Sequence, residues 1–276
     1  MKYKKRSTLL EDMAGLFISV LVFVFPFLFM LFNSLKERRE ANLLSFSIPR
    51  VFHWENYVEV FQTNDYILLK AFKNSMILTF FSVLGLIVVS SMAGYIIRRR
   101  DGRIIRIVNV LLMLGLMIPP AVIPTIWVMQ GLHVYRTMFG MILVEIALQI
   151  PFDIMLYQGF VGTIPIELEE AARIDGCKKG RLFFQIVFPL LKPVTSTIVI
   201  LNAVTIFNDF TNPLYFLPGT ENATVQQTLY NFTGQFASSY NLLFADVILI
   251  TLPMLLLFVV FNKKIVDGMA AGSIKG

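Results

Sequence analysis

One short polar segment of this sequence has the residue types and spacing to recognise another protein. The segment reads Glu170-Ala171-Ala172-Arg173-Ile174-Asp175-Gly176 and lies between two strongly apolar stretches. Leu168, Ala171 and Ala172 fall at positions i, i+3 and i+4, so a helix would place their side chains on one face. The small alanines would let a partner surface approach closely, while the charged side chains offer polar contacts. The chemistry that the segment predicts is therefore docking on a partner.

A second set of polar residues lies inside apolar stretches, where a charged group costs roughly 2.5 to 3.5 kcal/mol at mid-bilayer. Glu145, Gln149 and Asp153 are spaced four residues apart and would share one helical face. The next apolar stretch adds Asn202, Asn208 and Asp209. Such groups face protein or water, so they either line a path for a polar substrate or hydrogen-bond neighbouring helices. Both interpretations stay open.

The sequence lacks the motifs of the common catalytic classes. It contains no Gly-x-x-x-x-Gly-Lys-Ser/Thr phosphate loop, no His-Glu-x-x-His and no Gly-x-Ser-x-Gly, and its histidines are His53 and His133. We therefore expect a protein that is not an enzyme and that holds no metal or other cofactor. Energy for any transport must come from another subunit or from an ion gradient, in which case Glu145 or Asp153 would carry a proton with the substrate.

The composition indicates an integral membrane protein. Of 276 residues, 56% are apolar, and the mean hydropathy is +0.70, which one soluble core could not bury. A bilayer core of about 30 Å needs roughly 20 apolar helical residues. Six such windows predict an all-α protein with a single permease domain over residues 1–276. The windows are residues 13–32, 74–97, 104–129, 139–161, 190–210 and 245–261.

The basic residues predict the orientation, because cytoplasmic loops accumulate Lys and Arg. With six spans both termini lie on one side, and that side collects the basic residues of the ranges 2–6, 98–106, 173–192 and 263–275. Both termini are therefore expected in the cytoplasm. The first external loop also carries several basic residues and is the weakest support. The pI near 9.4 follows from this topology and the lipid bilayer, and it requires no nucleic acid.

The polar segment belongs to a cytoplasmic loop at about residues 162–189, between the fourth and fifth spans. Pro165 suits the first turn of a helix, Glu167, Glu169 and Glu170 suit its positive end, and Gly176 suits a left-handed stop. We expect a helix of about three turns. It either contacts another protein or lies on the headgroups as an amphipathic helix. In the third span, Pro119, Pro120 and Pro124 predict a break.

These residues resemble the Glu-Ala-Ala loop of binding-protein-dependent ABC transporter permeases. The family pattern is Glu-Ala-Ala, three residues, Gly, nine residues, Ile-x-Leu-Pro, and this chain reads Glu170-Ala171-Ala172, Gly176, Ile186-Val187-Phe188-Pro189. Phe188 replaces the usual Leu. Further segments are similar to the carbohydrate branch, in its smaller maltose-type or oligosaccharide-type permease. They are Asn33-Ser34-Leu35-Lys36, Glu55-Asn56-Tyr57, Ile164-Pro165-x-Glu167-Leu168-Glu169-Glu170, Phe207-Asn208-Asp209-Phe210 and the ending at residues 268–276.

The resemblance implies a subunit of a sugar or oligosaccharide importer in a bacterial-type cytoplasmic membrane. Its partners would be a second permease, two ATPase subunits that bind ATP and Mg, and an external solute-binding protein. The helix at residues 165–175 would sit in a cleft on an ATPase. Glu170, with Arg173 and Asp175, would make polar contacts, and Ala171 and Ala172 would allow close approach. Gly176 would permit the turn, and Pro189 would set the start of the fifth span.

Overall fold

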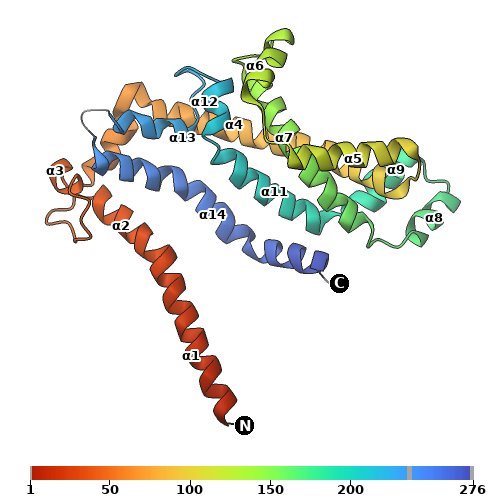
Figure 1. The fold of residues 1–276 in the computed structure, drawn as a ribbon, viewed down its shortest axis with the longest axis horizontal. Helices are drawn as coiled ribbons and strands as arrows, with labels where there is room; N and C mark the ends of the chain where they lie inside the picture. The colour runs from red at the N-terminus through yellow and green to blue at the C-terminus, as the bar shows by residue number, and fades with distance from the viewer. Residues whose placement is uncertain (1, 235–237, 274–276) are drawn as a thin grey trace. The chain divides into compact units, whose positions relative to one another are not determined.

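The computed structural model describes residues 2–234 and 238–273, and this part of the chain is helical without a strand (Figure 1). The all-α prediction is confirmed for these residues. The chain divides into two compact units, one of Met1–Leu69 with Gln227–Pro253, the other of Lys70–Gln226 with Met254–Gly276. Two long helices, α4 (Glu55–Arg99) and α14 (Tyr240–Ser273), contribute to both units. The single permease domain stays a prediction.

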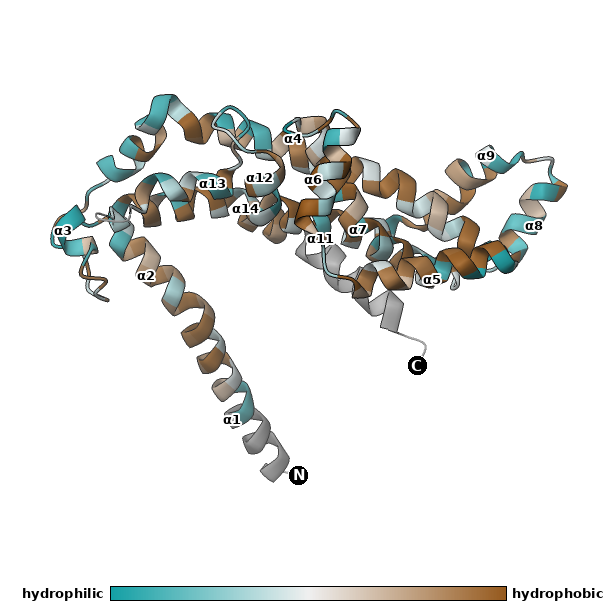
Figure 2. Cartoon of the chain, turned by 45° about the horizontal axis from the view of Figure 1, so that its top comes forward, coloured by the Kyte–Doolittle hydropathy of each residue, from teal (hydrophilic) through white to brown (hydrophobic). Residues whose placement is uncertain are grey.

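The first unit begins with one long helical stretch, whose part Glu11–Ser34 is apolar. It consists of α1 (Lys2–Ser19), a π-helical turn (Val20–Val24) and α2 (Phe25–Ser34). Figure 2 shows mostly hydrophobic residues along α2 and a hydrophilic stretch at the short α3 (Arg38–Ala41). The unit also holds the first part of α4, which leaves helical geometry at Thr63 and resumes after Tyr66.

The Asn-Ser-Leu-Lys motif forms a buried corner at the end of α2. Lys36 Nζ donates to Asn33 Oδ1 at 3.1 Å and to the Ser45 carbonyl at 2.7 Å. Asn56 Nδ2 donates to the carbonyls of Ser34 and Lys36 at 2.8 and 2.9 Å. Burial lowers the pKa of the Lys36 ammonium, and the Glu40 carboxylate acts in the opposite direction. The polar motif therefore folds back the chain where the first apolar stretch ends.

In the second unit, α7 (Met138–Val161) packs against α5 (Arg103–Met117), α11 (Lys192–Phe207) and α12 (Thr211–Phe216). Close helix contacts depend on small residues, as is common in membrane proteins. A Cβ atom added to Gly94 of α4 would lie 2.6 Å from Tyr157 Cβ and 3.2 Å from the Ile154 carbonyl oxygen of α7. The buried core of this unit includes Leu86, Met141 and Ile206.

The third predicted window, residues 104–129, is divided between two helices. α5 ends at Met117 and α6 (Val122–Gly131) follows, with Ile118 extended at ψ 122°. A residue before proline avoids helical geometry, so Pro119 and Pro120 break the window as predicted.

Four helices of the described residues are long and apolar enough to cross a membrane. They are Glu11–Ser34, Glu55–Arg99, Met138–Val161 and Tyr240–Val259. The pair Lys179–Leu190 and Lys192–Phe207, bent by 74°, could form a fifth span. This pair comprises α9 (Lys179–Leu182), the π-helical turn η2 (Phe183–Val187), α10 (Phe188–Leu190) and α11. The count of six spans stays a prediction.

Candidate functional site

The polar segment forms α8 (Glu167–Ile174), eight residues long. At 3.6 residues per turn this is little more than two turns, so the prediction of three turns that include Pro165 is wrong. The helix starts late because its first accepting carbonyl belongs to Ile166, to which the Glu169 and Glu170 amides donate at 2.9 and 3.1 Å. Two residues earlier, the Ile164 carbonyl accepts from Arg99 Nη2 at 2.7 Å instead of from a helical amide.

Gly176 ends α8 in the left-handed conformation, with φ at +80°. The Gly176 amide donates to the Arg173 carbonyl at 3.0 Å, and the Cys177 amide donates to the Ala172 carbonyl at 2.9 Å. This pair of bonds is a Schellman motif, which satisfies the last carbonyls of the helix. The predicted left-handed stop is confirmed.

Glu169 fastens α8 to the end of α4. Its side chain is 1% exposed, and Oε1 accepts from Arg99 Nε at 2.7 Å. Oε2 accepts from the Tyr95 hydroxyl at 2.6 Å and from Arg173 Nη2 at 3.5 Å. A buried carboxylate needs such charged and polar partners. We call Glu169 with Tyr95, Arg99 and Arg173 the tether.

The sequence pattern does not predict the tether. It places Glu169 only near the positive end of a helix, and it gives Arg99 only as one of the basic residues that predict the orientation. Tyr95 and Arg99 are four residues apart and so share a face at the basic end of an apolar run, which is a usable signal. The signal did not identify a partner, because Glu169 lies 70 residues from Arg99 in the chain.

The free face of α8 differs from the predicted one. Ala172 is buried at 7% exposure, on the same side as Glu169, whereas Ala171 is exposed. The docking role of the two alanines stays a prediction. Six of the eight residues of α8 are exposed, Leu168 and Arg173 among them. Four of the six fall at positions i, i+3, i+4 and i+7, and we call these four the free face: Glu167, Glu170, Ala171 and Ile174. Ile174 is 85% exposed, which is unusual for a large apolar side chain on a polar helix.

The other residues predicted to couple the chain to an ATPase are exposed. Arg173 and Asp175 are exposed, and Arg173 is partly engaged by the tether. Pro189 is exposed in α10, just ahead of the 74° bend between Leu190 and Lys192. Figure 2 shows the hydrophilic character of α8, in contrast to the mostly hydrophobic α5 and α7.

Asp153 and Asn202 join α7 to α11. Asn202 Nδ2 lies 3.0 and 2.8 Å from the two carboxylate oxygens of Asp153, and both side chains are buried. The Tyr157 hydroxyl donates to Thr195 Oγ1 at 3.0 Å between the same two helices. For Asp153 and Asn202 the contacts match the interpretation as hydrogen bonds between neighbouring helices.

Glu145 lies near the other end of α7. Glu145 is 1% exposed and its carboxyl group lies close to that of Asp209, while Oε1 has no partner among the described residues. Asp209 accepts from the Asn212 amide at 3.1 Å and from Asn212 Nδ2 at 2.6 Å, at the start of α12.

The remaining two predicted path residues are more open. Asn208 is exposed, and its Oδ1 accepts from Gln226 Nε2 at 3.0 Å. Gln149 is half-buried on α7. Of the five residues predicted for the substrate path, Asp153 is hydrogen-bonded to α11. Among the other four, Glu145 and Asp209 lie close to each other.

A sequence model of the family described as "Binding-protein-dependent transport system inner membrane component" matches residues 85–270. The chain belongs to this family. The matched region contains α8, the whole tether and all of the polar groups described in α7 and α11. The resemblance predicted from the Glu-Ala-Ala segment is therefore confirmed, and the protein is a multi-pass membrane permease of the ABC importer type.

Curated relatives of this permease include sugar permeases. The chain is 35% identical over 254 residues to the melibiose/raffinose/stachyose import permease protein MelC of Bacillus subtilis, covering 91% of each chain. It is 31% identical to the multiple sugar-binding transport system permease protein MsmG of Streptococcus mutans, covering 92% of this chain and 93% of the relative. It is 29% identical to the arabinooligosaccharides transport system permease protein AraQ of Bacillus subtilis, covering 93% and 92%.

Solved structures share the fold of this permease. A chain from a crystal structure of a bacterial ABC transporter, involved in the import of the acidic polysaccharide alginate, has a TM-score of 0.81 and 19% identity. That match covers 94% of this chain and 97% of the other. A second structure, of an alginate ABC transporter with an alginate pentasaccharide-bound periplasmic protein, gives a TM-score of 0.69 and 17% identity, covering 98% and 94%.

Proposed function

We propose that this permease is one of two transmembrane subunits of an importer that moves a sugar or oligosaccharide into the cytoplasm. ATP hydrolysis by two separate ATPase subunits, which bind ATP and Mg, drives the transport. The observation that carries the proposal is the free face of α8, which is exposed on a helix whose opposite face is fastened through Glu169. A partner that displaces this face therefore moves a helix that is held through Glu169, rather than a flexible loop.

The tether connects α8 to the apolar helices. Displacement of α8 acts on the end of α4 through Arg99 and Tyr95. It also acts on α7 through the short connection that precedes Glu167. Rigid helices joined by satisfied buried contacts transmit such a displacement, whereas a flexible loop would absorb it. In this mechanism, closure of the ATPase subunits changes the arrangement of α4 and α7.

The sugar class is inferred from the relatives, which are named for the import of melibiose, raffinose, stachyose or arabinooligosaccharides. An external binding protein delivers the substrate, as the periplasmic protein in the related alginate transporter complex suggests. We propose six crossings with both termini in the cytoplasm, in which α5 and α6 together form the third crossing.

For the substrate path we propose Glu145, Gln149, Asn208 and Asp209. Glu145 has an unpartnered buried oxygen among the described residues, and sugar hydroxyls are suitable donors to a carboxylate. Asp153 acts by holding α7 to α11 rather than by touching the sugar.

The test is the substitution Glu170→Lys, which reverses a charge on the free face. Reconstituted with its partner subunits, the variant is expected to lose at least tenfold in sugar uptake per ATP hydrolysed, because the ATPase contact is weakened. Glu59→Lys is the matched control, since Glu59 is exposed on α4 far from α8 in the chain. Unchanged uptake by the Glu170→Lys complex would remove α8 from the coupling mechanism. Uptake by this chain alone, driven by a proton gradient, would instead favour the secondary transporter.

A further inference from the structure

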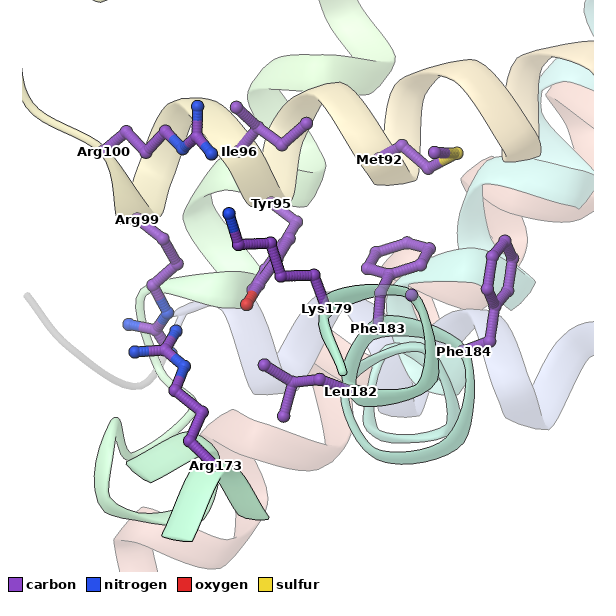
Figure 3. A pocket seen from close by; sticks show the side chains of 11 residues that line it. Met92, Tyr95, Ile96, Arg99, Arg100, Arg173, Lys179, Leu182, Phe183 and Phe184 are labelled. Carbon is purple, nitrogen blue, oxygen red and sulfur yellow. The ribbon is translucent and has the colours of Figure 1, made fainter. Parts of the chain in front are cut away.

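A pocket of about 610 Å³ lies in the second unit, between the end of α4 and the segment of α9 and η2 (Figure 3). Its cationic lining consists of Arg99, Arg100, Arg173 and Lys179. In Figure 3 the guanidinium groups lie toward one side of the pocket, Met92 and Phe184 lie toward the other, and Lys179 lies between them.

The positive charge of this pocket is only partly neutralised. Glu169 pairs with Arg99 at 2.7 Å and, more loosely, with Arg173 at 3.5 Å. Arg100 and Lys179 form no ion pair within the described part of the chain. One carboxylate therefore faces four cations, and the site attracts an anion.

The other side of the pocket is apolar and open. Met92 is 39% exposed, Ile96 41% and Phe184 58%, while Leu182 and Phe183 are buried behind them. Met92 and Ile96 belong to the end of the apolar run of α4, at the level where its basic residues begin. In a permease this is the depth at which acyl chains meet headgroups.

We propose that this pocket binds an anionic phospholipid. The headgroup phosphate lies among Arg100, Lys179 and the neighbouring guanidinium groups, and an acyl chain covers Met92, Ile96 and Phe184. Arginine forks match phosphate geometry, and basic pockets at the cytoplasmic side of transmembrane helices suit anionic headgroups. A soluble phosphate would account for the cations but would leave the exposed apolar side chains uncovered.

The bound lipid would stand directly beside the tether, because Arg99 and Arg173 belong to both. The lipid would thus supply negative charge to the two arginines that hold Glu169. Membrane composition would then affect how firmly α8 is held to α4.

The experiment titrates the assembled transporter, in mixed micelles of a neutral detergent, with fluorescent phosphatidylglycerol or fluorescent phosphatidylcholine. The double variant Arg100→Gln/Lys179→Gln spares the tether and is expected to weaken phosphatidylglycerol binding by tenfold or more. The control Arg103→Gln/Lys178→Gln removes the same charge from exposed neighbours that do not line the pocket. It is expected to change the dissociation constant by less than twofold.

Four outcomes would overturn the proposal. Equal weakening by both double variants would mean diffuse attraction to the basic surface. Displacement of phosphatidylglycerol by millimolar inorganic phosphate, at constant ionic strength, would mean a site for a free anion. Loss of a partner subunit from the pocket variant, with phosphatidylglycerol binding intact, would mean a protein interface. If the double variant does not assemble, Phe184→Gln tests the apolar half, and unchanged phosphatidylglycerol binding would overturn the proposal. None of these outcomes depends on whether Glu170 couples ATP hydrolysis to uptake.

Discussion

Glu169 and Glu170 are neighbours with opposite surroundings, and this contrast separates stability from docking at the level of single residues. The Glu169 carboxylate is enclosed by Tyr95 and Arg99, whereas Glu170 is exposed on the free face. Two identical substitutions, one residue apart, are therefore expected to have different effects.

Glu169→Gln is expected to destabilise the permease by about 3 kcal/mol, because it leaves the Arg99 guanidinium without its buried counter-charge. Glu170→Gln should change the free energy of unfolding by less than about 0.5 kcal/mol. Thermal unfolding of the purified transporter checks both, with a lower Tm expected for Glu169→Gln alone. Equal melting temperatures for the two variants would show that the tether contributes little to stability.

The sequence predicts that this polar segment is a helix, but it does not predict which of the side chains of α8 are buried and which are exposed. Within the eight residues of α8, spacing alone predicts a docking face of Leu168, Ala171 and Ala172. The structure turns Ala172 inward, because the buried Glu169 sets the rotation of the helix. A contact between residues 70 positions apart leaves no periodic signal, so neither the tether nor the rotation could be derived from local pattern.

At the level of elements, the structure depends on how closely α4 approaches α7. The predicted spans identified both helices, and Pro119 and Pro120 predicted the break between α5 and α6. The sequence did not identify which faces of the helices meet. That information lies in Gly94, where a side chain would collide with Tyr157 and with the backbone of α7.

Gly94→Ala is expected to destabilise the permease by about 1 to 3 kcal/mol, because the added Cβ forces α4 away from α7. Gly159→Ala on α7 is the control, since a Cβ there meets no atom within 4 Å and alanine favours the helix. The yield and Tm of the two purified variants are the measurements. A Gly94→Ala protein as stable as Gly159→Ala would mean that the two helices can separate without cost.

At the level of the whole molecule, the basic residues predict the orientation, and the chain's single cysteine, Cys177, makes this easy to test. In a Cys177→Ser background, Asp101→Cys lies between α4 and α5, and Glu221→Cys lies between α12 and α13. Both positions are exposed. They are predicted to lie on opposite sides of the membrane.

A membrane-impermeant maleimide is expected to label Glu221→Cys in intact cells and Asp101→Cys only in inside-out vesicles. The reason is the concentration of Lys and Arg on the cytoplasmic side. The Cys177→Ser protein without an added cysteine measures background labelling. Labelling of both positions from the same side would refute the six-crossing topology.

The tether also limits how such permeases can be recombined. A segment such as residues 162–176 looks like a module that could be exchanged between transporters to redirect them to a different ATPase. However, half of its attachment is encoded in α4, by Tyr95 and Arg99. A graft that carries the glutamate into a recipient without this pair would bury a carboxylate whose remaining partner is Arg173, at 3.5 Å. The unit of exchange is therefore the loop together with the end of α4.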